Sequence, residues 1–381
     1  MKIFDLIATS TFGIEAIVRR EVEDLGYNIT NVSDGKVTYT ADAEGIALSN
    51  LWLRSADRVL LKMGEFKATS FEALYNLTYD LPWEKWITQD AKFTVTGKSV
   101  KSGLYSVPDC QSIVKKAIVD RLSKHYNIKW FPETGPEYTV QVSILKDIAT
   151  LTIDTTGSVG LHKRGYRDKQ GGAPLKETLA AALIQISYWN KDRTLYDPFC
   201  GSGTIPIEAA MIARNIAPGL NREFASSHWP QLGDKLWKEV RQEAYDSIDL
   251  DTKLSIHASD IDRHGISVAK ENAASAGVDD CISFFVKSVH KSQLPRYNYG
   301  VVITNPPYGK RLSEREQVQE LHKSLANMLN TDPTWSSYII TSQNTLESDF
   351  GKKVNKRRKL FNGRIPVEFY QYFGPRPPRK E

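Results

Sequence analysis

Four consecutive residues, Asn305, Pro306, Pro307 and Tyr308, combine hydrogen-bond acceptors with an aromatic ring. The prolines fix φ and lack an N–H, so the carbonyl groups of Asn305 and Pro306 are left to accept from a ligand. The amide oxygen of Asn305 is another acceptor, and Tyr308 offers a flat face for stacking. Acceptors beside a stacking ring suit a planar group that carries an –NH2, such as a nucleobase with an exocyclic amine. A proline-rich turn capped by a core tyrosine would contain the same residues, so other parts of the chain must decide.

A second candidate site is the glycine-containing stretch Asp197-Pro-Phe-Cys-Gly-Ser-Gly-Thr204. It follows a short strand-like run and precedes a predicted helix at 205–214, which is the arrangement of nucleotide sites. It lacks the third glycine of the dinucleotide fingerprint, which disfavours a dehydrogenase, and it lacks the Walker A sequence. An acidic residue before the glycines repels phosphate but pairs with an amine or a hydroxyl. The loop is therefore typical of a site for a phosphate-free, cationic nucleoside.

Two aspartates, Asp260 and Asp262, end the predicted strand at 254–259. A carboxylate at the end of a second strand can accept both hydroxyls of a ribose, and we favour this role for Asp260. Capping of the predicted helix at 266–276 is the alternative for Asp262. Cys200 has no apparent activating partner, so a covalent cysteine mechanism is not expected. His162, His257 and His264 have no partner at metal-ligand spacing, so no metal site is expected.

Short apolar runs in the sequence predict the strands that must position these residues. In an open α/β sheet ligands bind at the carboxyl ends of the strands, so the candidate residues should meet at one edge. Asn362-Gly363, between apolar runs, predicts a final antiparallel hairpin over 359–373. The C-terminal half is therefore predicted to be a Rossmann-like α/β domain. Its expected strands lie at 194–196, 254–259, 282–286, 299–304 and 337–341.

The N-terminal half alternates strand and helix signals and predicts an α+β region. Helices are expected at 71–86 and 111–125, and a hairpin at 140–153. Basic residues lie among aromatic residues here, a pattern typical of nucleic-acid binding, although a solvated helix face would show the same lysines. A basic linker with several glycines follows at 156–170. The C-terminal stretch 351–381 contains ten Lys or Arg residues but only two Glu residues. The candidate RNA contacts are Lys98, Lys115, Lys116, Lys163, Arg164, Arg167, Arg357 and Arg358.

Composition restricts the class of protein. The 381 residues are 41% hydrophobic and 25% charged with a net charge of +5, as in an ordinary globular protein of two or three domains. No apolar run of about 18 residues and no signal peptide is present, so no membrane partner is expected. Three widely spaced cysteines imply neither a zinc site nor a disulfide framework, which fits a cytoplasmic location.

Taken together, these motifs resemble the class I S-adenosylmethionine (SAM)-dependent methyltransferases. The stretch 197–204 looks like their cofactor loop, Asn305 to Tyr308 like the motif of amino methyltransferases, and the last hairpin like their reversed final strand. More narrowly, the order of parts resembles the THUMP-domain RNA methyltransferases, close to the 23S rRNA guanine-N2 group. The stretches 153–157 and 161–167 are similar to the end of a THUMP module and its link to the catalytic domain.

This resemblance implies a seven-stranded class I methyltransferase sheet and four segments. They are a ferredoxin-like subdomain at 1–60, a THUMP-like RNA-binding domain at 61–155, a linker at 156–170 and a methyltransferase domain at 171–381. It also implies that SAM is the cofactor and S-adenosylhomocysteine (SAH) the product. The family usually has an acidic residue after the third strand to hold the adenine amine, whereas this chain has Ser288, a weaker acceptor. The implied cofactor residues are Asp197, Phe199, Cys200, Gly201, Gly203, Thr204, Asp260, Asp262, Ser288 and Asn305.

The expected function is methylation of an exocyclic base amine in structured RNA, with guanine N2 of 23S rRNA, or a precursor, implied by the resemblance. Asn305 and Pro306 would hold the amine hydrogens, and Tyr308 would stack on a flipped base. No obligate protein partner is evident, and no role is assigned to the Trp-rich insertion 215–253. Two alternatives stay open: a DNA adenine-N6 methyltransferase and a non-catalytic RNA-binding factor in ribosome assembly.

Overall fold

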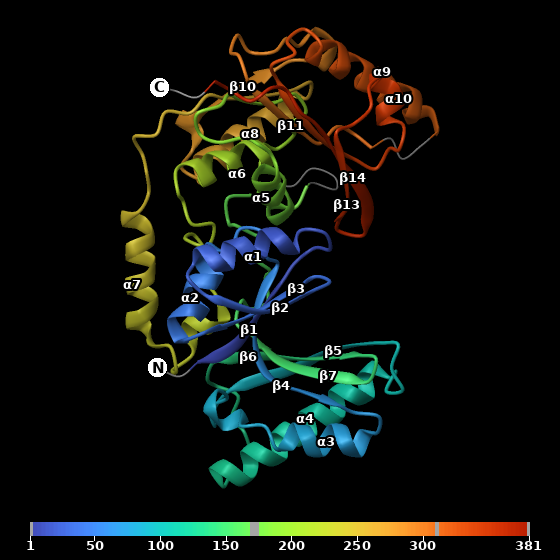
Figure 1. Ribbon diagram of the computed structural model, residues 1–381. Coiled ribbons are helices and arrows are strands. Elements are labelled where there is room, and N and C mark those ends of the chain that lie inside the picture. The colour runs from blue at the N-terminus through green and yellow to red at the C-terminus, as the bar shows by residue number, and fades with distance from the viewer. Residues whose placement is uncertain (1–2, 168–174, 309–311, 379–381) are drawn as a thin grey trace. The chain divides into compact units, whose positions relative to one another are not determined.

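The computed structural model describes residues 3–167, 175–308 and 312–378 (Figure 1). The chain forms two compact units. The predicted domain boundary at 170–171 and the last two basic residues of the tail lie outside the described residues. Within the described ranges, no helix combines the length and the apolar character needed to cross a bilayer. The first unit comprises Met1–Ser10, Val18–Leu161 and Arg222–Glu243, and the second comprises Thr11–Ile17, His162–Asn221 and Ala244–Glu381.

The first unit contains a seven-stranded sheet in the order β2-β3-β1-β4-β7-β6-β5. Neighbouring strands are antiparallel except β5 and β6, which are parallel. The hairpin predicted at 140–153 is confirmed as β6 and β7. The strands are β1 (Phe4–Thr9), β2 (Asn28–Ser33), β3 (Lys36–Ala41), β4 (Arg58–Lys67), β5 (Lys92–Val100), β6 (Glu137–Leu145) and β7 (Ile148–Asp154).

The helices of this region are α1 (Glu15–Asp24), α2 (Ala43–Trp52), α3 (Phe71–Tyr79), the 3-10 turn η1 (Trp83–Lys85) and α4 (Val107–Tyr126). Helix α4 packs against β5 and alongside α3. The single helix predicted at 71–86 is wrong, because α3 ends at Tyr79 and a separate turn follows. Pro82 accounts for the break: it lacks an N–H and disfavours helical backbone in the residue before it.

The middle part of the insertion that carried no assigned function, Arg222–Glu243, belongs to the first unit. This part contains the 3-10 turn η2 (Ala225–His228) and most of α7 (Gly233–Asp246), although both lie in the C-terminal half of the sequence. Trp229 is buried and stacks on Tyr138, with ring centroids 4.7 Å apart. Its indole N–H donates to the carbonyl of Glu137 at 3.3 Å. The tryptophans of the insertion are therefore core residues of the N-terminal unit.

The second unit contains a seven-stranded sheet in the order β10-β9-β8-β11-β12-β14-β13. Strands β10, β9, β8, β11 and β12 are parallel, whereas β14 is antiparallel to both β12 and β13. This confirms the predicted Rossmann-like sheet with an antiparallel last hairpin. The strands are β8 (Leu195–Asp197), β9 (Ile256–Asp260), β10 (Ile282–Val286), β11 (Val301–Thr304), β12 (Ser336–Thr341), β13 (Lys356–Asn362) and β14 (Ile365–Tyr372).

Helices cover this sheet and hold its strands in place. Helices α6 and α8 pack on β8, β9 and β10. On the face that carries Tyr196, Val302 and Ile339, a core cluster includes Leu325 of α9 and Leu346 of α10. The remaining elements are α5 (Glu177–Ile186), α6 (Thr204–Ala213), α8 (Arg263–Ser275), η3 (Asp279–Cys281), η4 (Val289–Lys291), α9 (Leu312–Leu329) and α10 (Leu346–Phe350).

Candidate active site

The motif that begins at Asn305 follows β11, between β8 and β12 in the sheet. The side-chain oxygen Oδ1 of Asn305 is buried and has no hydrogen-bond partner among the described residues. An unpartnered buried acceptor is costly in a folded protein, since it has lost its hydrogen bond to water. It therefore marks a position where a ligand donor is expected.

The backbone of this motif is held by contacts on both sides. Thr304 donates its hydroxyl to Oδ1 of Asp197 at 2.6 Å, which links the motif to the end of β8. Gln343 donates its side-chain N–H to the carbonyl of Tyr308. Gln343, which follows β12, accepts in turn from the Tyr370 hydroxyl at 3.3 Å through its own carbonyl. Thr304 and Gln343 were not predicted as site residues, because their roles depend on partners that are distant in sequence.

Tyr308 is partly buried, and its hydroxyl lies beside the Asn362 side chain at the end of β13. Burial raises the pKa of Tyr308 to about 12, so its phenol is neutral at physiological pH. Pro306 is buried and Pro307 is exposed. The ring and the neighbouring acceptors therefore lie at the carboxyl end of the same strand.

The two glycines of the predicted cofactor loop serve different purposes. Gly203 has φ +85°, and a Cβ there would lie 3.1 Å from the Cβ of Ala269, so the glycine permits close packing of α8. Gly201 has φ +51°, and a Cβ there would meet no atom within 4 Å. The backbone of Gly201 therefore borders open space at the start of α6, where a ligand can approach.

Asp260 connects the second strand to the glycine loop. Its Oδ2 accepts the backbone N–H of Gly201 at 2.9 Å, and its Oδ1 accepts that of Asp262 at 2.9 Å. Each carboxylate oxygen keeps a lone pair for further donors, such as ribose hydroxyls. Asp262 caps α8 by accepting from the N–H of His264 at 2.9 Å, which was the alternative considered for this residue.

Asp197 is buried beneath the loop. Its Oδ1 accepts the N–H of Phe199 at 3.1 Å as well as the Thr304 hydroxyl. Burial raises the pKa of Asp197 from 3.8 to about 7, because desolvation disfavours the charged form. Burial also raises the pKa of the Cys200 thiol well above its ordinary value, as do the neighbouring carboxylates. Cys200 is therefore a protonated thiol rather than a nucleophile.

Ser288 follows β10, whose last residue, Val286, pairs with Asp260 in parallel register. The N–H of Lys287 donates to the Asp260 carbonyl at 2.8 Å. Ser288 is partly exposed and thus lies at the same edge as Asp260. The structure therefore brings together the ends of β8, β9, β10 and β11, where the predicted cofactor and catalytic residues lie.

Two of the predicted RNA contacts have other roles. Arg164 is buried, with 2% of its side chain exposed, and forms an ion pair with Glu208 of α6 at 3.2 Å. Arg167 pairs with Glu177 at 3.2 Å and donates to the Thr204 hydroxyl at 3.0 Å. Buried, paired guanidinium groups cannot contact phosphates, so the prediction for Arg164 is wrong and Arg167 supports the start of α6. Glu208, the one charge in an otherwise apolar helix, was the sequence signal for such a partner.

The other predicted basic residues lie in different parts of the chain. Lys98 of β5 and Lys115 and Lys116 of α4 are exposed in the first unit. Both α4 lysines lie over aromatic rings, Lys115 at 5.6 Å from the Phe93 centroid and Lys116 at 5.9 Å from that of Tyr75. The partly exposed Lys163, together with Arg357 and Arg358 of β13, belongs to the second unit.

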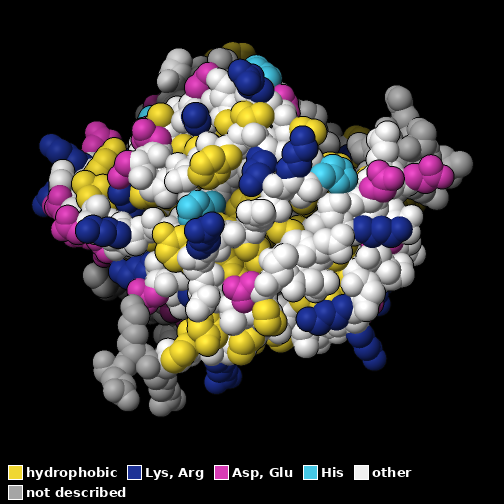
Figure 2. Space-filling view, turned by 90° about the horizontal axis from the view of Figure 1, so that it is seen from above, with side chains coloured by type: hydrophobic (Ala, Val, Ile, Leu, Met, Phe, Trp, Pro, Cys, Tyr) yellow, Lys and Arg dark blue, Asp and Glu magenta, His cyan; other side chains and the backbone are white. Residues whose placement is uncertain are grey.

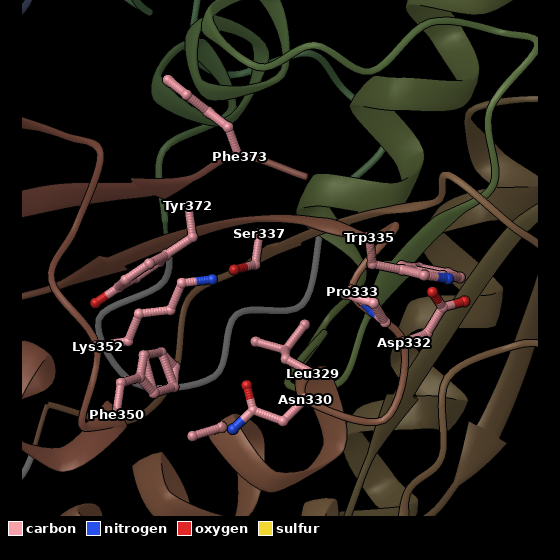
Figure 3. A pocket seen from close by; sticks show the side chains of 11 residues that line it. Leu329, Asn330, Asp332, Pro333, Trp335, Ser337, Phe350, Lys352, Tyr372 and Phe373 are labelled. Atoms are coloured by element: carbon pink, nitrogen blue, oxygen red, sulfur yellow. The ribbon is translucent and has the colours of Figure 1, made fainter. Parts of the chain in front are cut away.

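A pocket in the second unit lies at a different edge of the sheet (Figure 3). It is formed by the end of α9, the start of β12 and the end of β14, and Trp335, Phe350 and Tyr372 are among its lining residues. Because β12 starts there, the pocket lies at the amino end of that strand rather than at the carboxyl end. The predicted site residues do not line it.

Residues 164–371 match the family model described as "RMKL-like, methyltransferase domain". The chain belongs to this methyltransferase family. Residues 5–60 match the RlmL ferredoxin-like domain and residues 68–154 match the THUMP domain. The predicted resemblance to THUMP-domain methyltransferases is thus confirmed, and the sheet of the second unit is the class I methyltransferase sheet that it implied.

Relatives match this chain over nearly its whole length. The Bacillus subtilis protein named "Putative RNA methyltransferase YpsC" is 49% identical over 100% of this chain and 99% of its own length. The crystal structure of a predicted N6-adenine-specific DNA methylase from Listeria monocytogenes is 52% identical, with a TM-score of 0.94 over 98% of this chain and 97% of that one. SMU.472, solved in complex with SAH, is 42% identical, with a TM-score of 0.93 over 99% and 100% of the two chains.

Proposed function

We propose that this methyltransferase transfers a methyl group from SAM to the exocyclic amino group of a base in structured RNA, with release of SAH and of one amine proton to solvent. We propose further that the base is guanine in 23S rRNA, methylated at N2. The observation that carries the proposal is the buried, unpartnered Oδ1 of Asn305 beside the glycine loop. An acceptor at that position suits an amine donor, whereas carbon methylation would call for an activated nucleophile, and Cys200 is not one.

The residues at the strand ends fit SAM. The open space at Gly201 admits the cofactor, Asp260 retains acceptor capacity for ribose, and Ser288 lies where the adenine is expected. Asp197 would attract the positive charges of the cofactor once it is ionised. When bound, SAM supplies an electrophilic methyl group on a sulfonium. SMU.472, with the same fold and 42% identity, was solved with SAH, which supports this assignment.

The residues of the motif would act by orienting the amine. Its nitrogen is a poor nucleophile, since the lone pair is delocalised into the ring of the base. By accepting its two hydrogens, the Asn305 side chain and the Pro306 carbonyl would turn that lone pair towards the methyl group, while Tyr308 stacks on the base. Thr304 and Gln343 hold the motif in place, so that catalysis is mostly positioning.

An RNA substrate is supported by the THUMP match at 68–154 and by the name of the Bacillus subtilis relative. The exposed lysines of β5 and α4 lie within that match, and we assign RNA binding to 61–155 on this basis. On the face of the molecule in Figure 2, Lys and Arg side chains are scattered among acidic and apolar ones. That face therefore presents no uniformly basic surface. Guanine N2 and 23S rRNA rest on the family resemblance alone.

A DNA adenine-N6 methyltransferase is the second candidate, because the Listeria monocytogenes relative is described in those terms. Adenine N6 and guanine N2 offer the same –NH2 to Asn305. The decisive experiment supplies labelled SAM with rRNA from a strain that lacks this gene, or with duplex DNA, and then analyses digested nucleosides. We expect labelled N2-methylguanosine from RNA. Labelled N6-methyladenosine from RNA would overturn the assignment of guanine as the target base. Label in DNA alone would overturn the assignment of RNA as the substrate. Failure of the protein to bind SAM would favour a non-catalytic role.

Cofactor affinity should depend on pH through Asp197. In the folded protein the pKa of this carboxyl is raised from 3.8 to about 7, so the carboxyl keeps its proton up to about pH 7. Its contribution to the stability of the fold is therefore greatest at low pH and declines as the pH rises from 3.8 to about 7. A cationic cofactor favours the ionised form, so binding below pH 7 must displace the proton. We expect affinity to fall by up to about tenfold per pH unit below 7. Calorimetry at pH 6 in buffers of different ionisation enthalpy measures the released proton.

The matched variant is Asp197→Asn, which keeps an acceptor oxygen for Thr304 and Phe199 but does not titrate. Its cofactor affinity should be weaker at pH 8 and flat between pH 6 and 8. A wild-type protein that binds the cofactor without proton release at pH 6 would contradict the buried, protonated state of Asp197.

A further inference from the structure

The hairpin of β13 and β14 carries an aromatic ring beside the active site. Phe361 is 37% exposed and precedes Asn362, whose buried side chain points to the opposite face of β13 and lies beside the Tyr308 hydroxyl. The turn at Gly363 extends beyond the carboxyl end of β12, since the last β12 residue, Thr341, pairs only with Glu368 of β14. Phe361 therefore lies near the rim of the site where the target base is held.

A second exposed ring contacts Phe361. Phe12 is 48% exposed and lies in Thr11–Ile17, which is part of the second unit. The two ring centroids are 6.3 Å apart with the planes at 73°. Gly13 makes this approach possible: it has φ +94°, and a Cβ there would lie 2.8 Å from the Lys359 carbonyl. The backbone at Gly13 thus packs directly on β13 and holds Phe12 at the edge of the sheet.

Cations flank the aromatic pair. Lys359 is exposed and shares one face of β13 with Phe361, because alternate residues of a strand point to the same side. Arg364 is exposed in the turn. Arg357 shares that face, but it is paired with Glu368 at 3.1 Å. Two exposed cations therefore lie close to Phe361 along the chain.

Protection of a sheet edge accounts for only part of this arrangement. Strand β13 is the last strand of its sheet, and charged side chains on an edge strand prevent pairing with other chains. Two exposed phenylalanines work against that protection. Aromatic rings among cations are instead the combination that binds single-stranded nucleic acid, where the bases stack and the phosphates pair.

We propose that Phe12 and Phe361 form a stacking platform for an unpaired nucleotide of the RNA next to the target base, and that Lys359 and Arg364 contact its phosphates. The proposal rests on the proposed RNA methyltransferase function. It adds a surface that binds the RNA strand outside the pocket for the target base. Holding the neighbouring nucleotide would stabilise the flipped conformation of the target base, since it would offset part of the free energy that unstacking costs.

The test uses the full chain with two readouts. One is methylation of rRNA from a strain that lacks this gene, and the other is binding of a short, fluorescein-labelled single-stranded RNA. Phe361→Leu keeps an apolar side chain but removes the ring, and we expect it to lower kcat/KM and RNA affinity by about five- to a hundredfold, the loss expected for one stacked base. Phe361→Tyr should retain both, Phe12→Leu should show a smaller loss, and cofactor affinity should be unchanged in each variant.

The control is Tyr188→Leu, which removes a 61% exposed ring that packs on Phe373, after the carboxyl end of β14 and thus away from the hairpin turn. It should leave both readouts unchanged, and melting temperatures confirm that each variant is folded. If Phe361→Leu methylates RNA as well as the wild type does, the stacking platform is wrong and the proposed function stands. If the wild type itself transfers no methyl group to RNA, the proposed function is wrong.

Discussion

Replacing Asn305 by alanine is expected to lower the rate of methyl transfer by roughly a hundredfold or more, while cofactor affinity stays within a few-fold of the wild type. The change removes the buried Oδ1, which has no partner among the described residues and is therefore available to the target amine. Its loss leaves the amine free to rotate, so the lone pair is no longer directed at the methyl group. Single-turnover methylation and calorimetry with SAM separate the two effects.

Asn305→Asp is the matched control, because it keeps an acceptor at the same position. It should retain much more activity than Asn305→Ala. Stability should be little changed in the alanine variant, since no internal hydrogen bond of Oδ1 is lost. Turnover in Asn305→Ala at the wild-type rate would show that the amine is not positioned by this side chain, and the proposed mechanism would fail.

The catalytic sheet could be predicted because its signals are local. Buried parallel strands are continuous apolar runs, and β11 and β12 are fully buried along their length. Asn362-Gly363 indicated the hairpin because a tight turn needs a residue with positive φ, and Gly363 has φ +63°. Since parallel strands end at one edge, locating their ends was enough to bring Asp197, Asp260 and Asn305 together.

The parts that could not be predicted depend on partners distant in sequence. Arg164 looked like a surface cation, and only the fold shows that Glu208 pairs with it in the core. Trp229 gave no sign that it stacks on Tyr138, a residue of the other half of the chain. The support that Gln343 gives to Tyr308 is equally non-local. Periodicity reports which face of an element is buried, but not what it is buried against.

Gly201→Val is expected to weaken cofactor binding by roughly a hundredfold or more, because its side chain would fill the space that the cofactor needs. A Cβ at Gly201 meets no protein atom within 4 Å, so the folded protein can accommodate the new side chain. The backbone has φ +51°, which costs a non-glycine residue about 1–3 kcal/mol of stability. Calorimetry with SAM measures the affinity, and thermal unfolding measures the strain.

Gly277→Val separates strain from occlusion. Gly277 also has positive φ, +70°, and a Cβ there also meets nothing within 4 Å, but it follows α8 at the end remote from the loop. Both variants should lose comparable stability, since both force valine into left-handed backbone. Only Gly201→Val should lose cofactor affinity, because only Gly201 lies between Asp197 and the start of α6. Equal SAM affinity in the two variants would mean that the cofactor does not approach this loop. The assignment of Asp197 and Asp260 to the cofactor site would then be wrong.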